Sequence, residues 1–248
     1  MLDRVPVITI DGPSSSGKGT LARLVKSWLG WHLLDSGSLY RLVALEARRG
    51  GTDFEDEAAL AAVAGRLRAE FVDEKAETKL VLRGCDVTDD LRSEACGTDA
   101  SSLAAYPAVR AALLERQRAF LEPPGLVADG RDMGTVVFPH ADLKIYLTAS
   151  TEERARRRYK QLKQKGMSVN LAQLLGDIAE RDRRDKQRTV SPLKPATDAV
   201  LFDTTRLDVS AVEDQIKRLV RDIGLASSTR FKRTTPDCPL TRLGDEDA

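Results

Sequence analysis

Apolar residues in this chain fall into short runs and into longer stretches with helical period. The short runs are bounded by turn residues and predict five strands, at residues 5–10, 32–35, 126–129, 143–148 and 199–203. Amphipathic stretches predict helices at residues 19–29, 37–49, 107–122, 151–164, 170–189 and 210–224. Strands separated by helices favour an α/β fold whose parallel sheet is covered on both faces and binds ligands beyond the C-terminal ends of its strands.

The pattern changes between residues 73 and 96. Residues 78–83 alternate between apolar and polar side chains, and Gly84 begins a turn that leads to Val87. This predicts a small antiparallel insert over residues 62–102. The last residues, 227–248, lack apolar periodicity and are expected to form a disordered tail, which leaves one domain over residues 1–226.

The composition is typical of a globular protein. The chain has 248 residues, of which 42% are hydrophobic and 31% charged, and its net charge of +1 gives no reason to expect a nucleic-acid or membrane partner. The charge is unevenly distributed, however. Residues 151–191 contain 12 Lys or Arg against 6 Asp or Glu, which predicts a bound anion in that region.

The three cysteines, Cys85, Cys96 and Cys238, do not have the spacing of metal ligands, and only His32 and His140 are available to join them. A zinc site is therefore not expected. The chain has no run approaching the ~18 apolar residues of a membrane span, and its first residues lack the core of a signal peptide. We expect a cytoplasmic monomer with reduced thiols.

A glycine-rich run follows the first predicted strand and opens into a helix. In this arrangement backbone N–H groups turn around phosphate oxygens, Lys18 provides a cation for the β- and γ-phosphates, and the helix points its positive end at the same place. A plain strand–turn–helix corner is the weaker interpretation, because the motif and its flanks coincide. Gly19 stands where the strict motif has Ser or Thr, a variant typical of kinases that act on nucleoside monophosphates. The run consists of Gly12, Pro13, Ser14, Ser15, Ser16, Gly17, Lys18, Gly19 and Thr20.

Two other strand ends carry polar residues. Ser36 follows the second strand and Arg41 lies one helical turn later, so they are candidates for substrate contacts, although a serine there is often only a helix cap. The third strand runs into Asp129, Arg131 and Asp132. Because α/β enzymes place chemistry at the C-terminal ends of strands, these residues are stronger candidates than a polar turn would be.

Two helical segments are rich in charge. Arg181, Asp185 and Arg188 have the spacing of one helix face, so they fit either a clamp for a phosphorylated sugar or a solvated, salt-bridged helix. The predicted helix at residues 151–164 carries four arginines between residues 154 and 158. These fit either a mobile cationic flap or a solvated face, since four such positions cannot share one side of a helix.

Four stretches together resemble bacterial cytidylate kinases, which belong to the P-loop nucleoside monophosphate kinases. They are the phosphate loop ending at Thr20, residues 31–37, residues 129–139 and residues 180–188. The resemblance extends over residues 6–224, in the order and spacing of the family, and the run at residues 130–139 is its most discriminating part. It implies a P-loop NTPase three-layer sandwich with a central parallel sheet, an insert that enlarges the monophosphate-binding region, and a mobile lid at residues 151–167.

The resemblance also implies roles for individual residues. Cytosine offers an amino group from which a carboxylate can accept a hydrogen bond, while its ring nitrogen and carbonyl need donors such as Arg and Ser. An aspartate, an arginine and a serine are the residue types that the resemblance assigns to the base. Ser36 is a further candidate for binding the substrate. The implied contacts are Arg41, Arg131 and Arg188 with the phosphate of the monophosphate, Arg181 and Asp185 with the ribose, and Ser101, Arg110 and Asp132 with cytosine.

The implied reaction moves the γ-phosphoryl group of ATP to CMP or dCMP, giving ADP and CDP or dCDP. The protein's part is to hold the acceptor in line and to stabilise negative charge with Mg²⁺ and with Lys18, Arg131, Arg157 and Arg188. Thr20 is the candidate hydroxyl ligand of Mg²⁺, with Asp129 as a partner through water. A general base is not required, because a phosphate monoester is already largely ionised at neutral pH.

Two alternatives remain open. A P-loop kinase for another monophosphate, or for a sugar or shikimate-like alcohol, would share the phosphate loop, but an alcohol kinase would need a base for its hydroxyl and no base-reading pair of Arg110 and Asp132. A regulator that binds nucleotides without turnover is least favoured. The chain has no Asn-Lys-x-Asp guanine-reading motif and retains a row of arginines suited to phosphoryl transfer.

Overall fold

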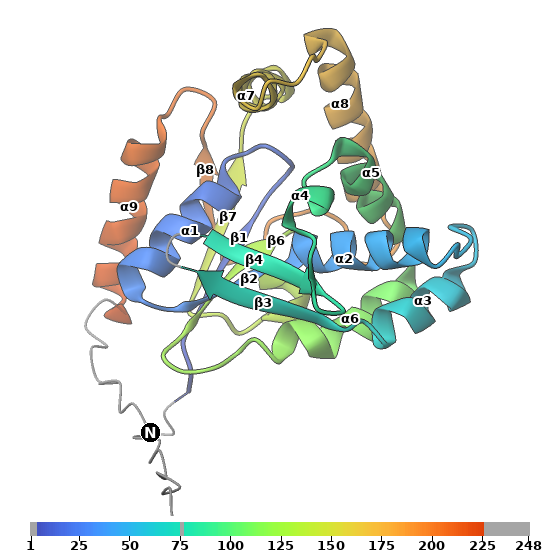
Figure 1. The fold of residues 1–248 in the computed structure, drawn as a ribbon. Coiled ribbons are helices and arrows are strands. Elements are labelled where there is room, and N and C mark those ends of the chain that lie inside the picture. Colours follow the sequence, from blue (N-terminus) through green and yellow to red (C-terminus); the bar gives the residue numbers. More distant parts are fainter. Residues whose placement is uncertain (1–3, 75–76, 226–248) are drawn as a thin grey trace, which may run out of the picture.

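The fold centres on a five-stranded parallel sheet. The computed structural model describes residues 4–74 and 77–225, and Figure 1 shows the sheet between two groups of helices. The strand order is β2-β6-β1-β7-β8, and each neighbouring pair is parallel. This confirms the predicted α/β fold with its parallel sheet. The strands are β1 (Val7–Asp11), β2 (His32–Asp35), β6 (Leu126–Gly130), β7 (Leu143–Thr148) and β8 (Val200–Asp203).

The central strands have a continuous apolar character because both of their faces are covered. Every residue of β1 and β6 is buried. Ile8 and Ile10 pack in the core beneath α1 (Lys18–Leu29) and α9 (Val209–Asp222), whereas Val7 packs in the core on the other side. That second core lies under α2 (Ser36–Arg49), α3 (Glu57–Gly65) and α6 (Pro107–Arg118) (Figure 1).

Strand register brings the polar strand ends to one edge of the sheet. Asp35 of β2 is the partner of Asp129 of β6, and Asp11 of β1 is the partner of Gly130. Residues that are widely separated in sequence therefore end at the same level. The substrate site is expected at this edge.

The predicted antiparallel insert is present as a three-stranded sheet. Its strands are β3 (Ala69–Glu74), β4 (Glu77–Leu82) and β5 (Cys85–Asp86), paired in that order. Two helices that were not predicted within residues 62–102 follow the sheet: α4 (Thr88–Leu91) and α5 (Glu94–Leu103). The Ser93 side chain accepts a hydrogen bond from the Cys96 N–H at 3.3 Å and so caps α5.

Two more differences concern helix ends and a short turn. Helix α6 ends at Arg118, with Ala119 as its C-cap, instead of residue 122, where the following Pro123 disfavours a helical conformation. A π-helical turn, η1 (Met133–Val137), follows β6 after Arg131 and Asp132 and had no counterpart in the predicted elements.

Helices α7 (Thr151–Gln164) and α8 (Leu171–Gln187) pack against each other beyond the C-terminal edge of the sheet (Figure 1). The bounds of α7 agree with the predicted helix. Among the described residues, no helix has both the length and the apolar character needed to cross a membrane. The predicted tail, residues 227–248, lies outside the described residues.

Candidate active site

A cavity of about 840 Å³ opens beyond the C-terminal ends of the central strands. Its walls come from the phosphate loop, α1, α2, α5, the end of β6, and residues of α7 and α8. Leu207, just before α9, and Val209, the first residue of α9, also contribute to the lining. All of the predicted phosphate loop except Gly12 and Pro13 lines this cavity.

The phosphate loop is shaped by two glycines. A Cβ at Gly12 would lie 2.1 Å from the Leu147 carbonyl oxygen, so the loop can cross β7 closely only with glycine there. Gly17 has a φ of 97°, which favours glycine, and it precedes α1 without a side-chain cap. The first N–H groups of α1 therefore remain available to an anion. Lys18 donates from Nζ to the Pro13 carbonyl at 3.2 Å, which folds its side chain back over the loop.

The two charges at the loop influence each other. Burial, together with the positive charge of Arg131, lowers the pKa of Lys18 to about 8. Burial raises the pKa of Asp129 to about 6, although Lys18 opposes that change and Asp35 adds to it. Lys18 thus remains mainly protonated at neutral pH. A Cβ at Gly19 would lie 3.1 Å from Asp129 Oδ2, which gives a steric reason for glycine at a position where the strict motif has a hydroxyl.

The described residues contain no group of three or more His, Cys, Asp or Glu side chains that could hold a metal ion. A divalent cation here would depend on few protein oxygens and on nucleotide phosphates. Asp129 fits that requirement, because its Oδ1 atom is buried and has no hydrogen-bond partner among the described residues. Thr20 is exposed at the end of the loop, with its hydroxyl 3.5 Å from Arg23 Nη2.

A second, smaller cavity of about 50 Å³ adjoins the first, and the two share Arg41, Arg131 and Arg181 in their linings. Nearly every predicted substrate-binding residue meets here, from α2, α5, α6 and α8 and from the segments that follow β6 and α8. The predicted residues in its lining are Ser36, Arg41, Ser101, Arg110, Arg131, Asp132, Arg181 and Arg188, joined by Tyr40.

Arg110 and Asp132 form a buried ion pair at this cavity. Arg110 also donates to the Ala104 carbonyl at 3.3 Å, and its guanidinium lies 5.8 Å from the centre of the Tyr40 ring. The Ser101 hydroxyl and the Arg110 Nε atom are buried and have no hydrogen-bond partner within the described part of the chain. The cavity thus presents a carboxylate beside unused donors, the combination that suits a base with both an amino group and acceptors.

Asp185 holds two of the arginines in place. Its carboxylate accepts from Arg131 Nε at 2.9 Å and from Arg188 Nη2, and it is only 1% exposed. Burial opposes ionisation, but the two arginines keep the pKa of Asp185 below its usual range. Asp185 is absent from the linings of both cavities, whereas Arg181 lines both. Burial and the positive charge of Arg131 lower the pKa of Arg181 to about 9.

Ser36 and Arg41 are held by neighbouring elements. The Ser36 hydroxyl accepts from Gln117 Nε2 at 3.0 Å, which leaves its own proton free to be donated elsewhere. Arg41 donates from Nη1 to the Ser93 carbonyl at 3.1 Å, across from α2 to the start of α5. A Cβ at Gly97 would lie 2.7 Å from Arg41 Nη2, so α5 approaches the guanidinium closely.

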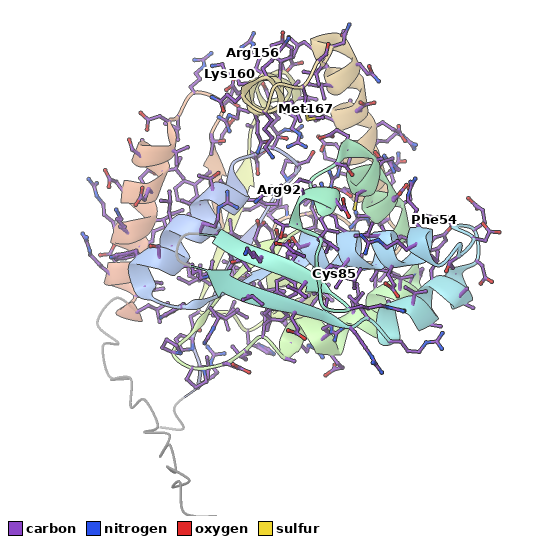
Figure 2. All side chains as sticks on the ribbon, in the orientation of Figure 1. Phe54, Cys85, Arg92, Arg156, Lys160 and Met167 are labelled. Atoms are coloured by element: carbon purple, nitrogen blue, oxygen red, sulfur yellow. The ribbon has the colours of Figure 1, made fainter. Side chains whose placement is uncertain are left out.

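The four arginines of α7 face different surroundings. Arg157 donates to the Ser16 carbonyl at 3.2 Å, and Arg154 donates to the Ser14 carbonyl at 3.2 Å. The loop therefore directs these carbonyl oxygens toward α7. Arg158 reaches across the cleft to form an ion pair with Glu94 of α5, whereas Arg156 is exposed and labelled on the outer side of α7 in Figure 2.

All three guanidinium nitrogens of Arg154 donate hydrogen bonds within the protein. It donates to Asp182 through both terminal nitrogens, and Nε donates to the Ala149 carbonyl at 3.0 Å. Arg157 also donates to the Thr204 hydroxyl at 3.0 Å, and it lines the large cavity. Of these two arginines only Arg157 is in a position to face a bound nucleotide.

Several residues that organise the site were not among the predicted site residues: Asp11, Tyr40, Gln117 and Thr204. Gln117 had a local signal, because it lies seven residues after Arg110 and so on the same face of α6. Asp11 was visible only as an acidic residue directly before the phosphate loop. Its carboxylate is buried, and burial raises its pKa to about 7 although backbone N–H groups of Gly134 and Met133 lower it.

Comparison with known proteins identifies the family. A model of the cytidylate kinase family matches residues 8–222. A cytidylate kinase of Pseudomonas fluorescens (strain SBW25) is 58% identical over 224 residues, covering 89% of this chain and 98% of the relative. The cytidylate kinase of Stutzerimonas stutzeri (strain A1501) is 57% identical over 228 residues, covering 91% of this chain and all of the relative.

A solved structure of shikimate kinase from Acinetobacter baumannii in complex with shikimate covers 89% of this chain and 96% of its own chain. Its sequence identity of 16% and its TM-score of 0.41 are too low to support any inference about the substrate. The family match and the two relatives together span nearly all the described residues. The chain belongs to the cytidylate kinase family.

Proposed function

We propose that this chain transfers the γ-phosphoryl group of ATP to CMP or dCMP, giving ADP and CDP or dCDP. The observation that carries the proposal is the small cavity with its buried Arg110–Asp132 pair, which adjoins the cavity lined by the phosphate loop. A base-reading site beside a triphosphate site is what a nucleoside monophosphate kinase requires. The relatives named cytidylate kinase support the same substrate class.

The donor side uses the loop amides and Lys18. The N–H groups at the start of α1 and the protonated Lys18 amine bind the β- and γ-phosphates. Mg²⁺, held by Thr20 and through water by Asp129, would neutralise phosphate charge when bound. Arg157 contributes from the lid side, where it remains anchored to the Ser16 carbonyl.

The acceptor side uses the arginines that surround the small cavity. Arg41, Arg131 and Arg188 bind the phosphate of the monophosphate, and Arg131 and Arg188 also stabilise charge on the transferring group. Asp185 keeps both of these arginines charged and oriented. We also propose that Asp185 and Arg181 contact the ribose of the monophosphate.

Recognition of the base rests on complementary hydrogen bonds. Asp132 accepts from the exocyclic amino group of cytosine, while Arg110 and Ser101 donate to the ring nitrogen and the carbonyl. Uracil presents a carbonyl where cytosine has the amino group, so it meets the carboxylate unfavourably. Ser36 contributes a further hydroxyl to the same cavity.

The unit proposed to perform this reaction is the domain at residues 1–226, with its insert at residues 62–102 and its lid at residues 151–167. We also propose that it acts in the cytoplasm as a monomer, in pyrimidine metabolism, with no nucleic-acid or membrane partner.

A coupled ADP-release assay across CMP, dCMP, UMP, AMP, GMP and shikimate tests the proposal. We expect the highest kcat/KM with CMP or dCMP and no acceptor-dependent ADP release with shikimate. A higher kcat/KM for shikimate or for a purine monophosphate would contradict it, as would ADP release that does not depend on the acceptor.

A further inference from the structure

Asp11 is a buried acidic residue to which the proposed reaction assigns no role. It is the last residue of β1, the middle strand of the sheet, and it is 5% exposed. Its two carboxylate oxygens accept hydrogen bonds from consecutive backbone N–H groups, Met133 at 2.9 Å and Gly134 at 2.8 Å. These are the first two residues of η1.

The bonds matter because of where those N–H groups lie. The first N–H groups of a helical turn have no partner within the turn, and here a side chain from another strand supplies one. The Met133 N–H belongs to the planar peptide group that begins at the Asp132 carbonyl carbon. Holding this peptide group fixes the backbone on the C-terminal side of Asp132.

Other contacts fix the same short segment. The Asp132 carbonyl accepts from the N–H groups of Val136 at 2.9 Å and Val137 at 3.2 Å, which completes the π-helical turn. A Cβ at Gly134 would lie 2.8 Å from the Thr9 hydroxyl, so the turn packs closely on β1. The segment therefore contacts β1 both by packing, at Thr9, and through the two hydrogen bonds of Asp11.

The Asp132 side chain extends from this anchored segment to Arg110 in the base cavity. Its position is set by the backbone that carries it, and a carboxylate that reads an amino group is sensitive to small displacements. We propose that Asp11 is a positioning residue for base recognition: its carboxylate holds the Asp132–Met133 peptide group so that Asp132 faces Arg110 and the amino group of cytosine. This inference rests on the proposed transfer to CMP.

The first test compares Asp11→Asn with Thr9→Val. An asparagine keeps one acceptor but turns its amide N–H₂ toward a second N–H donor, so one of the two bonds is lost. Thr9→Val is the matched control, because Thr9 lies on the same face of β1, is fully buried, and has a hydroxyl without a hydrogen-bond partner among the described residues.

We expect Asp11→Asn to raise the KM for CMP by about tenfold, as a displaced recognition group does, and to change the KM for ATP by less than about twofold. Thr9→Val changes both by less than about twofold. Because Asp11 directly precedes the phosphate loop, a rise in the KM for ATP as large as that for CMP would overturn the proposal.

A double-mutant cycle tests whether Asp11 acts through Asp132. In the Asp132→Asn background, we expect Asp11→Asn to lower kcat/KM for CMP by less than about twofold, because the group that it positions has already been changed. A full loss of about tenfold in that background would show that Asp11 acts independently of Asp132 and would overturn the proposal.

Hydrogen exchange on the unmodified chain gives a test that does not depend on any variant folding. We expect CMP to slow exchange at the Met133 and Gly134 amides by about tenfold, and ATP alone to leave it unchanged within about twofold. Exchange rates that do not respond to CMP would overturn the proposal. If CMP is neither bound nor phosphorylated, the proposed function itself fails, whereas turnover of CMP without these effects refutes only the role of Asp11.

Discussion

Replacing Asp132 with asparagine tests the base-reading pair most sharply. The substitution keeps the shape of the side chain but removes its charge, and the new amide can donate as well as accept. Cytosine then loses a strong acceptor for its amino group, while uracil loses an unfavourable neighbour. We expect kcat/KM for CMP to fall by about tenfold or more, and the ratio of kcat/KM for CMP to that for UMP to shrink.

The structure also gives the cost to stability. The side chains of Arg110 and Asp132 are 8% and 4% exposed, and without the carboxylate Arg110 keeps the Ala104 carbonyl and the Tyr40 ring. Breaking a buried ion pair costs about 3–5 kcal/mol, and because asparagine keeps an oxygen acceptor we expect about 2 kcal/mol. For a chain of this size that corresponds to a fall in Tm of about 5 °C.

The assay measures kcat/KM for CMP and UMP in the unmodified chain and the variant, with Tm measured in parallel. Asp182→Asn is the matched control, because Asp182 is similarly buried and paired with an arginine but lies outside both cavities. The control should lose comparable stability and keep its CMP/UMP ratio. An unchanged ratio in Asp132→Asn would refute base reading by Asp132.

Three further predictions follow from the same contacts. Lys18→Ala should keep a near-normal Tm yet reduce kcat/KM by orders of magnitude, and near-normal turnover would contradict the phosphate-loop assignment. Arg154→Lys should lower the free energy of unfolding, measured by urea denaturation, by about 2 kcal/mol or more, because lysine cannot make both contacts with Asp182. The control Arg156→Lys, at an exposed position, should leave the free energy of unfolding unchanged. Burial raises the pKa of Asp11 from 3.8 to about 7, so between these pH values the native state binds one proton more than the unfolded state. The free energy of unfolding should therefore fall as pH rises through that range, by at most about 1.4 kcal/mol per pH unit from this group. Asp11→Asn should remove that part of the slope, and identical slopes in the two proteins would contradict it.

The strands of the central sheet could be predicted from the sequence because they are buried on both faces. Buried strands appear as short apolar runs, and all five predicted strands occur in the structure with small shifts at their ends. Helix α3 was missed because its residues, 57–65, are nearly all apolar and show no amphipathic period. Helix α5 was missed because its apolar residues are few, and their burial depends on packing against α2.

In the candidate site, contacts between residues close in sequence could be predicted, whereas contacts between distant residues could not. The spacing of Arg181, Asp185 and Arg188 predicted one helix face. Helix α8 ends at Gln187, so Arg188 lies just beyond the helix, but Asp185 still contacts it. The Asp11 contacts with η1 join residues more than 120 positions apart, so no local spacing predicts them. The same holds for Arg154, whose bond to the Ser14 carbonyl forms only when α7 folds over the phosphate loop.

The most direct test of the central claim identifies the product itself. ³¹P NMR of a mixture of the protein, Mg²⁺, ATP and CMP follows both substrates and all phosphorylated products. We predict that CDP and ADP appear in equal amounts as ATP and CMP disappear. ADP with inorganic phosphate and unchanged CMP, or no change in ATP at all, would contradict phosphoryl transfer to CMP.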